Sequence, residues 1–273
     1  MSQRFQLVLL ALFVLAATGF SAWRHYHPPE SPALVDDLDD VGRPPAGWVP
    51  KHFLPAPIVK GREMAVAPKT PTLEKKQTFF DTLRPVIRQE NGRIAELRAK
   101  LLLAHAADET PAWVADVART YRIDWTGTEW DALLARVDIV PLTLMLAQAA
   151  NESSWGQSRF ARQGNNIFGM WCFRPGCGII PARRAVGKTH EVAAYANVNA
   201  SVRAYLHAIN TVGAYASLRK LRAKMRLAGR RLDANRLAGG LTRYSERGQA
   251  YVREIRNMIR ANRSLMLGVP KPG

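Results

Sequence analysis

The sequence predicts a mainly α domain of the α+β class that carries a small loop or hairpin lobe and follows an N-terminal anchor and a proline-rich tether. Three observations support this architecture. Apolar residues recur at three- and four-residue intervals from about Thr72 onward, which is the spacing of amphipathic helices. Glycine, asparagine and proline interrupt that pattern between Gly164 and Pro181, and recurrent prolines replace it before Thr72.

The first 23 residues predict export. Arg4 precedes an apolar run from Leu7 to Phe20, and no charge follows until Arg24. A basic start before a short apolar core is typical of a secretory signal or an N-terminal anchor. The run is shorter than the roughly 20 residues that span a bilayer comfortably, although extending it to Trp23 makes a thin membrane possible. Small residues near Thr18 form only a poor cleavage site, so we favour an uncleaved anchor.

Residues 24–71 and the overall charge narrow the range of partners. Recurrent prolines over 24–71 predict an extended linker that holds a domain away from the membrane. The chain has 39 Lys and Arg against 22 Asp and Glu, a formal net charge of +17. Such a charge favours anionic polymers, lipid head groups or an acidic cell wall. Export makes nucleic acid a disfavoured partner.

Periodicity and capping residues predict the helices of the remaining chain. The firmest starts at Pro141, because proline suits the first helical turn and an alanine-rich segment follows it. Thr128 is expected to cap another helix. The expected helices run from Thr72 onward through Leu102, then over 111–121, 130–137, 141–152, 199–212, 215–227 and 249–261, with a short hairpin over 178–195.

The basic run between Arg219 and Arg231 has two interpretations. The simpler one is the solvated face of a helix and the loop that follows it. The functional one is attraction to anionic lipid or to the carboxylates of wall peptides, worth about 1 kcal/mol per charge near a membrane.

The only two cysteines, Cys172 and Cys177, flank a Pro-Gly turn. A close, even pair in an exported chain predicts a disulfide loop. A zinc site needs further ligands, and the nearest histidine, His190, follows an arginine-rich stretch. No metal site is therefore expected.

Glu152 is the candidate for acid catalysis. It follows Met145 and Ala149 at helical spacing, so it shares their inward face. Burial and the negative end of the helix dipole both disfavour the carboxylate anion and should raise its pKa. A general acid acting near neutral pH needs that property. The alternatives are a carboxylate paired with Arg159 or one turned to water, since ion pairs also perturb pKa values.

The residues around Glu152 resemble those of a known family. The segment from Ala149 to Ser158 resembles the catalytic signature of the bacterial glucosaminidase family with a lysozyme-like fold, that is, mannosyl-glycoprotein endo-beta-N-acetylglucosaminidase-like proteins of glycoside hydrolase family 73. The Asn165–Gly169 segment resembles the asparagine turn that follows it. The segment 195–205 is similar to the family's entry into its next helix, and 244–252 is closest to the Bax-like branch.

The resemblance implies a glycan groove between two lobes and hydrolysis of β-1,4 links on the reducing side of N-acetylglucosamine. Residues 126–265 would form the catalytic domain and 72–125 a helical N-terminal extension. Glu152 would donate the proton, and Tyr244 resembles a family tyrosine that faces the cleft. Peptidoglycan glycan strands are the expected partner, no cofactor is implied, and the location is the periplasm, at the inner membrane. The expected substrate contacts are Asn151, Ser154, Trp155, Asn165, Asn166, Phe168, Trp171 and Tyr195.

The second catalytic group is less defined. Glycosidases usually pair an acid with a base or nucleophile. Glu191 lies in the predicted hairpin, opposite Glu152, and is our candidate base. The substrate's own N-acetyl group is the alternative. Rival functions are a lytic transglycosylase with a similar glutamate, a non-catalytic wall-binding protein, and a membrane-tethered nucleic-acid binder supported by charge alone.

Overall fold

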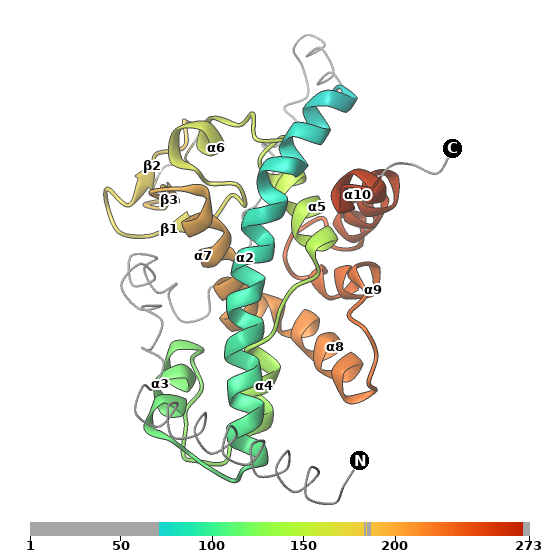
Figure 1. Cartoon of the computed structure of the whole chain (residues 1–273). Helices are drawn as coiled ribbons and strands as arrows, with labels where there is room; N and C mark the ends of the chain where they lie inside the picture. The colour runs from blue at the N-terminus through green and yellow to red at the C-terminus, as the bar shows by residue number, and fades with distance from the viewer. Residues whose placement is uncertain (1–70, 183, 185–186, 270–273) are drawn as a thin grey trace, which may run out of the picture. The chain divides into compact units, whose positions relative to one another are not determined.

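The computed structural model of the 273-residue chain describes residues 71–182, 184 and 187–269 (Figure 1). The predicted anchor over residues 1–23 and nearly all of the predicted tether over 24–71 lie outside the described residues. None of the helices in the described ranges has the length and apolar character needed to cross a membrane.

The longest helix, α2 (Leu73–Ala106), belongs to the core of the domain. It starts where the sequence predicts, because the Thr72 hydroxyl accepts a hydrogen bond from the Lys75 amide at 3.3 Å and so caps the helix. Phe80, Leu83 and Ile87 form its buried face and join the main apolar core. The helix packs against α5, α7 and α10. Helix α2 of the predicted extension thus shares its core with the helices that follow it.

The remaining helices largely confirm the predicted pattern. The last one ends at Leu267 rather than at the expected Ala261, and two short helices, α6 and α9, are additions to the prediction. The helices are α3 (Ala112–Thr120), α4 (Trp130–Arg136), α5 (Leu142–Glu152), α6 (Arg159–Gly164), α7 (Val198–Thr211), α8 (Ala216–Leu227), α9 (Ala234–Ala238) and α10 (Gln249–Leu267), with 3-10 turns η1 (Gly213–Tyr215) and η2 (Gly239–Leu241).

The predicted cap of α4 is wrong. Glu129, rather than Thr128, occupies the N-cap position, and no side-chain cap bond forms there. The Glu129 carboxylate instead accepts the Thr126 amide at 2.7 Å, so it closes the turn that precedes the helix.

A small sheet forms the predicted lobe. The expected hairpin is present as β2 (Gly178–Ile179) and β3 (Glu191–Ala193), and β1 (Trp171–Cys172) pairs with the other edge of β3. Both pairings are antiparallel, in the order β1-β3-β2. Gly178 is required in β2, because a Cβ atom there would lie 2.1 Å from the Val192 carbonyl oxygen.

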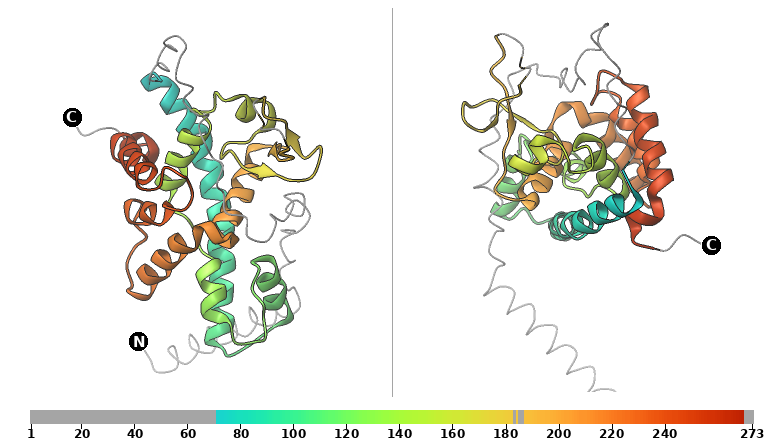
Figure 2. Two further views of the ribbon diagram at one scale, coloured as in Figure 1. Left: turned by 180° about the vertical axis from the view of Figure 1, so that it is seen from behind. Right: turned by 90° about the horizontal axis from the view of Figure 1, so that it is seen from above.

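The lobe and the C-terminal helices lie on opposite sides of α2. Figures 1 and 2 show α6 and the strands on one side, and α8, α9 and α10 on the other. Helix α5 packs against α9 and α10, whereas α6 packs against β2. Glu152, the last residue of α5, therefore lies where the chain passes from the helices to the strand lobe.

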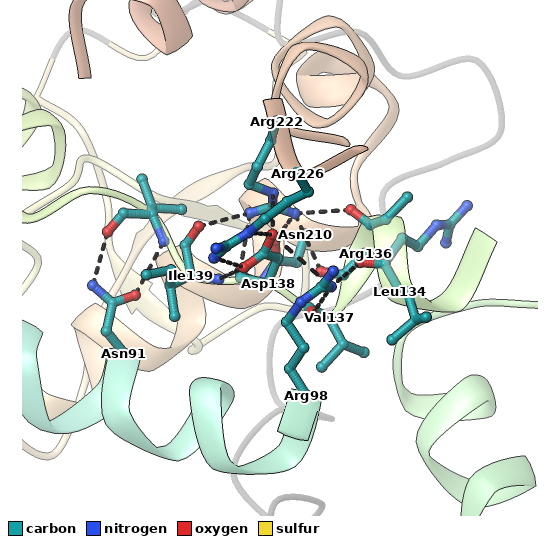
Figure 3. A network of polar contacts seen from close by, with 12 residues as sticks. Asn91, Arg98, Leu134, Arg136, Val137, Asp138, Ile139, Asn210, Arg222 and Arg226 are labelled. Carbon is teal, nitrogen blue, oxygen red and sulfur yellow. Dashed lines mark hydrogen bonds and ion pairs between the residues drawn. The ribbon is translucent and has the colours of Figure 1, made fainter. Parts of the chain in front are cut away.

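Asp138 organises a buried polar network at the entry to α5 (Figure 3). Its carboxylate is 1% exposed and accepts two hydrogen bonds from Arg226, at 2.7 and 2.9 Å. Arg222 from α8 and Arg98 from α2 lie at 3.8 and 3.9 Å. Arg222 also donates to the carbonyl oxygens of Asp138 and Ile139 at 2.9 and 3.2 Å. These contacts tie α2 and α8 to the segment that leads into α5.

Two residues of the basic run are not on a solvated face. Arg222 is fully buried and Arg219 is 8% exposed, and Arg219 donates to the carbonyl oxygens of Ile209 and Val212 at 2.7 Å. For these two residues the prediction of a solvated helix face is wrong, because backbone carbonyl groups accept hydrogen bonds from both buried guanidinium groups and Asp138 lies 3.8 Å from that of Arg222.

Replacing Asp138 with Asn should destabilise the protein strongly. The change leaves the buried guanidinium of Arg222 without a counter-charge, and breaking a buried ion pair costs about 3–5 kcal/mol. Urea denaturation of the variant measures this loss. Asp116→Asn, which breaks a pair with Arg119 whose side chains are 67% and 78% exposed, is the matched control and should change stability by less than about 1 kcal/mol. Equal losses of stability in the two variants would show that the Asp138 network contributes no more than an exposed ion pair.

Candidate active site

Glu152 occupies the C-terminal end of a buried helix, as predicted. Pro141 is the N-cap of α5, and eight consecutive residues, Thr143 to Ala150, are buried. The helix therefore has almost no solvated face until its last turn. There Asn151 and Glu152 become partly exposed, so the carboxyl group lies at the boundary between core and solvent.

Two donors hold one oxygen of the Glu152 carboxyl group. The Tyr251 hydroxyl donates to Oε1 at 2.8 Å, and the Asn151 amide nitrogen donates to the same oxygen at 3.3 Å. Tyr251 is in turn held by Gln148, whose amide nitrogen donates to the tyrosine hydroxyl oxygen at 3.3 Å. Gln148 is fully buried and lies one turn before Glu152 on α5. This chain of bonds fixes the direction of the Tyr251 hydroxyl.

The pKa of Glu152 is raised. Burial is the largest cause, because loss of hydration disfavours the anion. Hydrogen bonds from Tyr251 and Asn151 act in the opposite direction, and the negative charge of Glu254 adds to the increase. The carboxyl group therefore keeps its proton to a higher pH than an exposed glutamate does, as the sequence predicts.

A row of aromatic rings supplies the apolar surroundings of this carboxyl group. Neighbouring ring centroids are 4.1 Å apart for Phe168 and Tyr205, 6.2 Å for Tyr205 and Tyr215, 5.7 Å for Tyr215 and Tyr244, and 5.0 Å for Tyr244 and Tyr251. All five side chains are buried. We call these five residues the aromatic row. Burial raises the pKa of the Tyr244 hydroxyl, and the charge of Glu152 raises it further, so Tyr244 acts as a neutral group.

The turn after Glu152 has an unusual backbone. Ser154 and Trp155 have φ angles of 53° and 58°, in the left-handed region that non-glycine residues rarely adopt, and Gly156 follows at 75°. Ser153 holds this turn, since its hydroxyl donates to the Ala149 carbonyl oxygen at 2.6 Å and accepts the Gly156 amide at 2.7 Å. Ser154 is exposed on this turn, two residues after Glu152.

The turn directs Trp155 toward α2. Its ring packs edge-on against Phe79 and Phe80, with centroids 5.8 and 5.4 Å apart, and the Lys76 ammonium lies 5.3 Å from its centroid. Trp155 and Phe79 line a mostly apolar cavity of about 570 Å³ between α2 and this turn. Glu152 is not among the lining residues, so this cavity adjoins the turn and does not contain the acid.

The two asparagines of the expected substrate turn make backbone contacts. Asn165 adopts a left-handed conformation at the end of α6, and its amide donates to the Tyr195 carbonyl oxygen at 2.8 Å. Asn166 is buried and donates to the carbonyl oxygens of Met170 and Ala193 at 2.8 and 2.7 Å. Both side chains fasten the strand lobe to the turn after α6.

The predicted aromatic contacts divide into a core residue and two partly exposed ones. Phe168 is fully buried in the aromatic row. Trp171 is partly exposed and stacks on His190, with ring centroids 4.0 Å apart. Tyr195 is also partly exposed, and burial of its hydroxyl raises the pKa of that group. Trp171 and Tyr195 are thus partly accessible to solvent on the strand lobe, whereas Phe168 is not.

Glu191 and the disulfide form one unit. Cys172 and Cys177 are joined in a disulfide, as predicted. Glu191 pairs with Cys172 across the sheet, and its two carboxylate oxygens accept the amides of Gly176 and Gly178 at 2.9 and 2.8 Å. These backbone hydrogen bonds, with a smaller contribution from Arg184, lower the pKa of Glu191. Both sulfur atoms are committed to the disulfide, so this cluster offers a metal ion a single carboxylate.

Three residues around Glu152 have roles that the sequence analysis did not assign. Tyr251 donates a hydrogen bond to Glu152, Gln148 orients Tyr251, and the negative charge of Glu254 raises the pKa of Glu152. The helical spacing of Tyr251 with Ile255 on α10 is the one signal that could have indicated an inward face for this tyrosine. Nothing in that spacing indicated which residue, 99 positions away, it would contact.

Comparisons with known proteins identify the family of this chain. The family described as mannosyl-glycoprotein endo-beta-N-acetylglucosaminidase matches residues 127–264. Over 200 residues the chain is 34% identical to "Protein bax" of Escherichia coli (strain K12), an alignment that covers 70% of this chain and 71% of that protein. No solved structure matches. The mainly helical fold with its small strand lobe, the disulfide and these two matches show that the chain belongs to the glucosaminidase family, as a Bax-like member with a lysozyme-like fold.

Proposed function

We propose that this protein hydrolyses β-1,4 glycosidic bonds of peptidoglycan on the reducing side of N-acetylglucosamine, with Glu152 as the general acid. Family membership supports a glycan hydrolase. The observation that carries the finer proposal is the Glu152 carboxyl group, which lies at the rim of the core with a raised pKa and one oxygen held by Tyr251. A general acid near neutral pH needs a proton that is retained until the leaving oxygen requires it.

The hydrogen bonds of Glu152 suit this role in both protonation states. Tyr251 and Asn151 hold Oε1, so Oε2 would carry the proton and present it to the glycosidic oxygen. As the bond between the sugar carbon and that oxygen breaks, Glu152 becomes an anion. The Tyr251 hydroxyl then donates to a charged acceptor, and such bonds are roughly twice as strong as neutral ones. These two hydrogen bonds therefore favour the anion over the protonated form, and they offset part of the cost of burying it.

The group that assists the attacking water is the second part of the proposal. Glu191 stays ionised, as a base must, but both of its oxygens accept backbone amides and its lowered pKa makes it a weak proton acceptor. We therefore favour assistance by the N-acetyl group of the substrate, with Glu191 holding the disulfide loop. Glu191 as the base remains the alternative.

The location of the protein is also a proposal. A glucosaminidase domain suggests a role in the cell envelope. The basic start and apolar run of residues 1–23 support a chain tethered at the inner membrane and facing the periplasm.

Product analysis tests the reaction. The protein and its Glu152→Gln variant are incubated with purified peptidoglycan, and the reduced products are identified by mass spectrometry. We expect fragments with a reducible N-acetylglucosamine end from the parent chain and at least a thousandfold fewer from the variant. Anhydro products would assign a lytic transglycosylase instead. Binding without products from either protein would indicate a glycan-binding protein.

Replacing Tyr251 with Phe should change the pH profile as well as the rate. Loss of this donor removes a bond that lowers the pKa of Glu152, so the pKa rises further. The general acid is then protonated over a wider range, and the alkaline limb of the activity profile should move to higher pH. At the same time kcat should fall about 10- to 100-fold, because a hydrogen bond to a charged group contributes about 1.5–3 kcal/mol.

Tyr121→Phe is the control for this pH experiment, since it removes the hydroxyl of another buried tyrosine, near His207. This control variant should change neither kcat nor the pH of the alkaline limb. An alkaline limb that does not move in Tyr251→Phe would contradict the proposed link between this tyrosine and Glu152.

Replacing Glu191 with Gln separates its two possible roles when it is compared with Cys172→Ser/Cys177→Ser. The double variant loosens the same loop but keeps the carboxylate. If Glu191 only holds the loop, both variants should lose activity by similar factors, within about tenfold. If Glu191 is the base, its variant alone should lose about 100-fold or more, together with the acidic limb of the pH profile.

A further inference from the structure

The surface formed by α8 and the connection to α9 is strongly cationic. No aspartate or glutamate occurs between Val192 and Leu232. Some cations of this stretch are used internally, since Arg222 and Arg226 pair with Asp138. Lys220, Lys224, Arg230 and Arg231 are instead exposed.

A cavity of about 420 Å³ lies between α8, α9 and the middle of α10. Four cationic residues line it: Lys224, Arg230, Arg236 and Arg256. None of its lining residues is acidic; the others are Leu221, Met225, Ala228 and Gly239, which give it an apolar base. We call this site the cationic cleft.

The cations of the cationic cleft are available to a ligand. Arg256 donates to the Asn235 carbonyl oxygen at 2.8 Å, which positions its guanidinium without neutralising it. Among the residues that the structure describes, no carboxylate forms an ion pair with the four lining cations. Asp233 is the acid closest in sequence to Arg230 and Arg236, and its carboxylate caps α9 by accepting the Arg236 amide at 2.7 Å.

Leu227 adds an apolar element to this surface. It is the last residue of α8 and is 88% exposed, the largest exposed fraction among the described large apolar residues. Its neighbours include Arg226 and Arg230. An exposed leucine flanked by cations is typical of segments that lie at the surface of an anionic membrane, with the apolar side chain in the interface and the cations at the head groups.

We propose that the cationic cleft and Leu227 form a docking site for an anionic phospholipid surface. The phosphate groups of the lipids would occupy the cationic cleft, and Leu227 would enter the interface. A soluble anion would use the cations but would leave Leu227 in water, and for this reason we favour a membrane. Figures 1 and 2 show α8 and α9 on the opposite side of α2 from the strand lobe, so docking through α8 leaves the lobe free. The inference does not depend on the proposed hydrolase activity.

Binding of the full chain to vesicles provides the first test. Partition is measured with phosphatidylglycerol and with phosphatidylcholine vesicles, because an apolar N-terminal segment contributes to both and cancels in their ratio. Lys224→Gln/Arg230→Gln should lower this ratio about 25-fold, since each cation near an anionic surface contributes about fivefold. The matched control, Arg260→Gln/Arg263→Gln, removes two exposed cations from α10 and should lower it by less than about threefold.

A site-specific label provides the second test. The two native cysteines are joined in a disulfide, so a single new thiol can be labelled without reduction. A fluorophore at Leu227→Cys should be quenched by brominated phosphatidylglycerol. The same fluorophore at Leu103→Cys, on an exposed leucine of α2, should not be quenched.

Several outcomes would overturn the docking site. Equal losses in the two charge variants would show that net charge, rather than the cationic cleft, determines the partition. Equal quenching at the two labels would exclude insertion of Leu227. Displacement by millimolar glycerol phosphate without vesicle binding would assign the cleft to a soluble phosphate. Weaker peptidoglycan binding by Lys224→Gln/Arg230→Gln, with unchanged vesicle binding, would show that the cationic cleft binds wall carboxylates.

Discussion

The buried carboxylate of Asp138 is the interaction on which the arrangement of this domain depends. A carboxylate excluded from water is stable only when cations and donors replace its hydration, and here Arg98, Arg222 and Arg226 do so from two helices. Burial lowers the pKa of Arg222 to about 10, so this guanidinium is still charged at neutral pH. The network fixes where α5 begins, and the eleven residues of α5 then determine where Glu152 lies.

The carboxyl groups at the two ends of α5 differ in how the cost of their burial is compensated. At the start, a buried carboxylate is fully compensated by charge and stabilises the structure. At the end, Glu152 is hydrogen-bonded by Tyr251 of the aromatic row, no cation pairs with it among the residues that the structure describes, and burial raises its pKa. Such an incompletely compensated group reduces stability at a pH where it ionises. The helix therefore connects a buried ion-pair network to a carboxyl group whose pKa is raised by burial.

Local patterns in the sequence predicted most of the helices and the position of Glu152. Apolar periodicity is clear over the 34 residues of α2, but five or six residues, as in α9 and α6, are too few to show it. Close spacing of two cysteines was enough to predict the disulfide. The partners of Glu152 and Asp138 could not be predicted in the same way, because Tyr251 and Arg222 come from helices distant in sequence. Arg222 in particular has the sequence context of a solvated residue and becomes buried because carbonyl groups of the α4–α5 connection surround it.

The turn after Glu152 depends on its packing against α2. Left-handed backbone at Ser154 and Trp155 costs about 1 kcal/mol per residue and has to be compensated by other contacts. Part of the compensation is the packing of Trp155 on Phe79 and Phe80 of α2. The family match begins at residue 127, whereas α2 ends at Ala106. Helix α2, which precedes the family match, therefore helps to hold the turn after Glu152 in place.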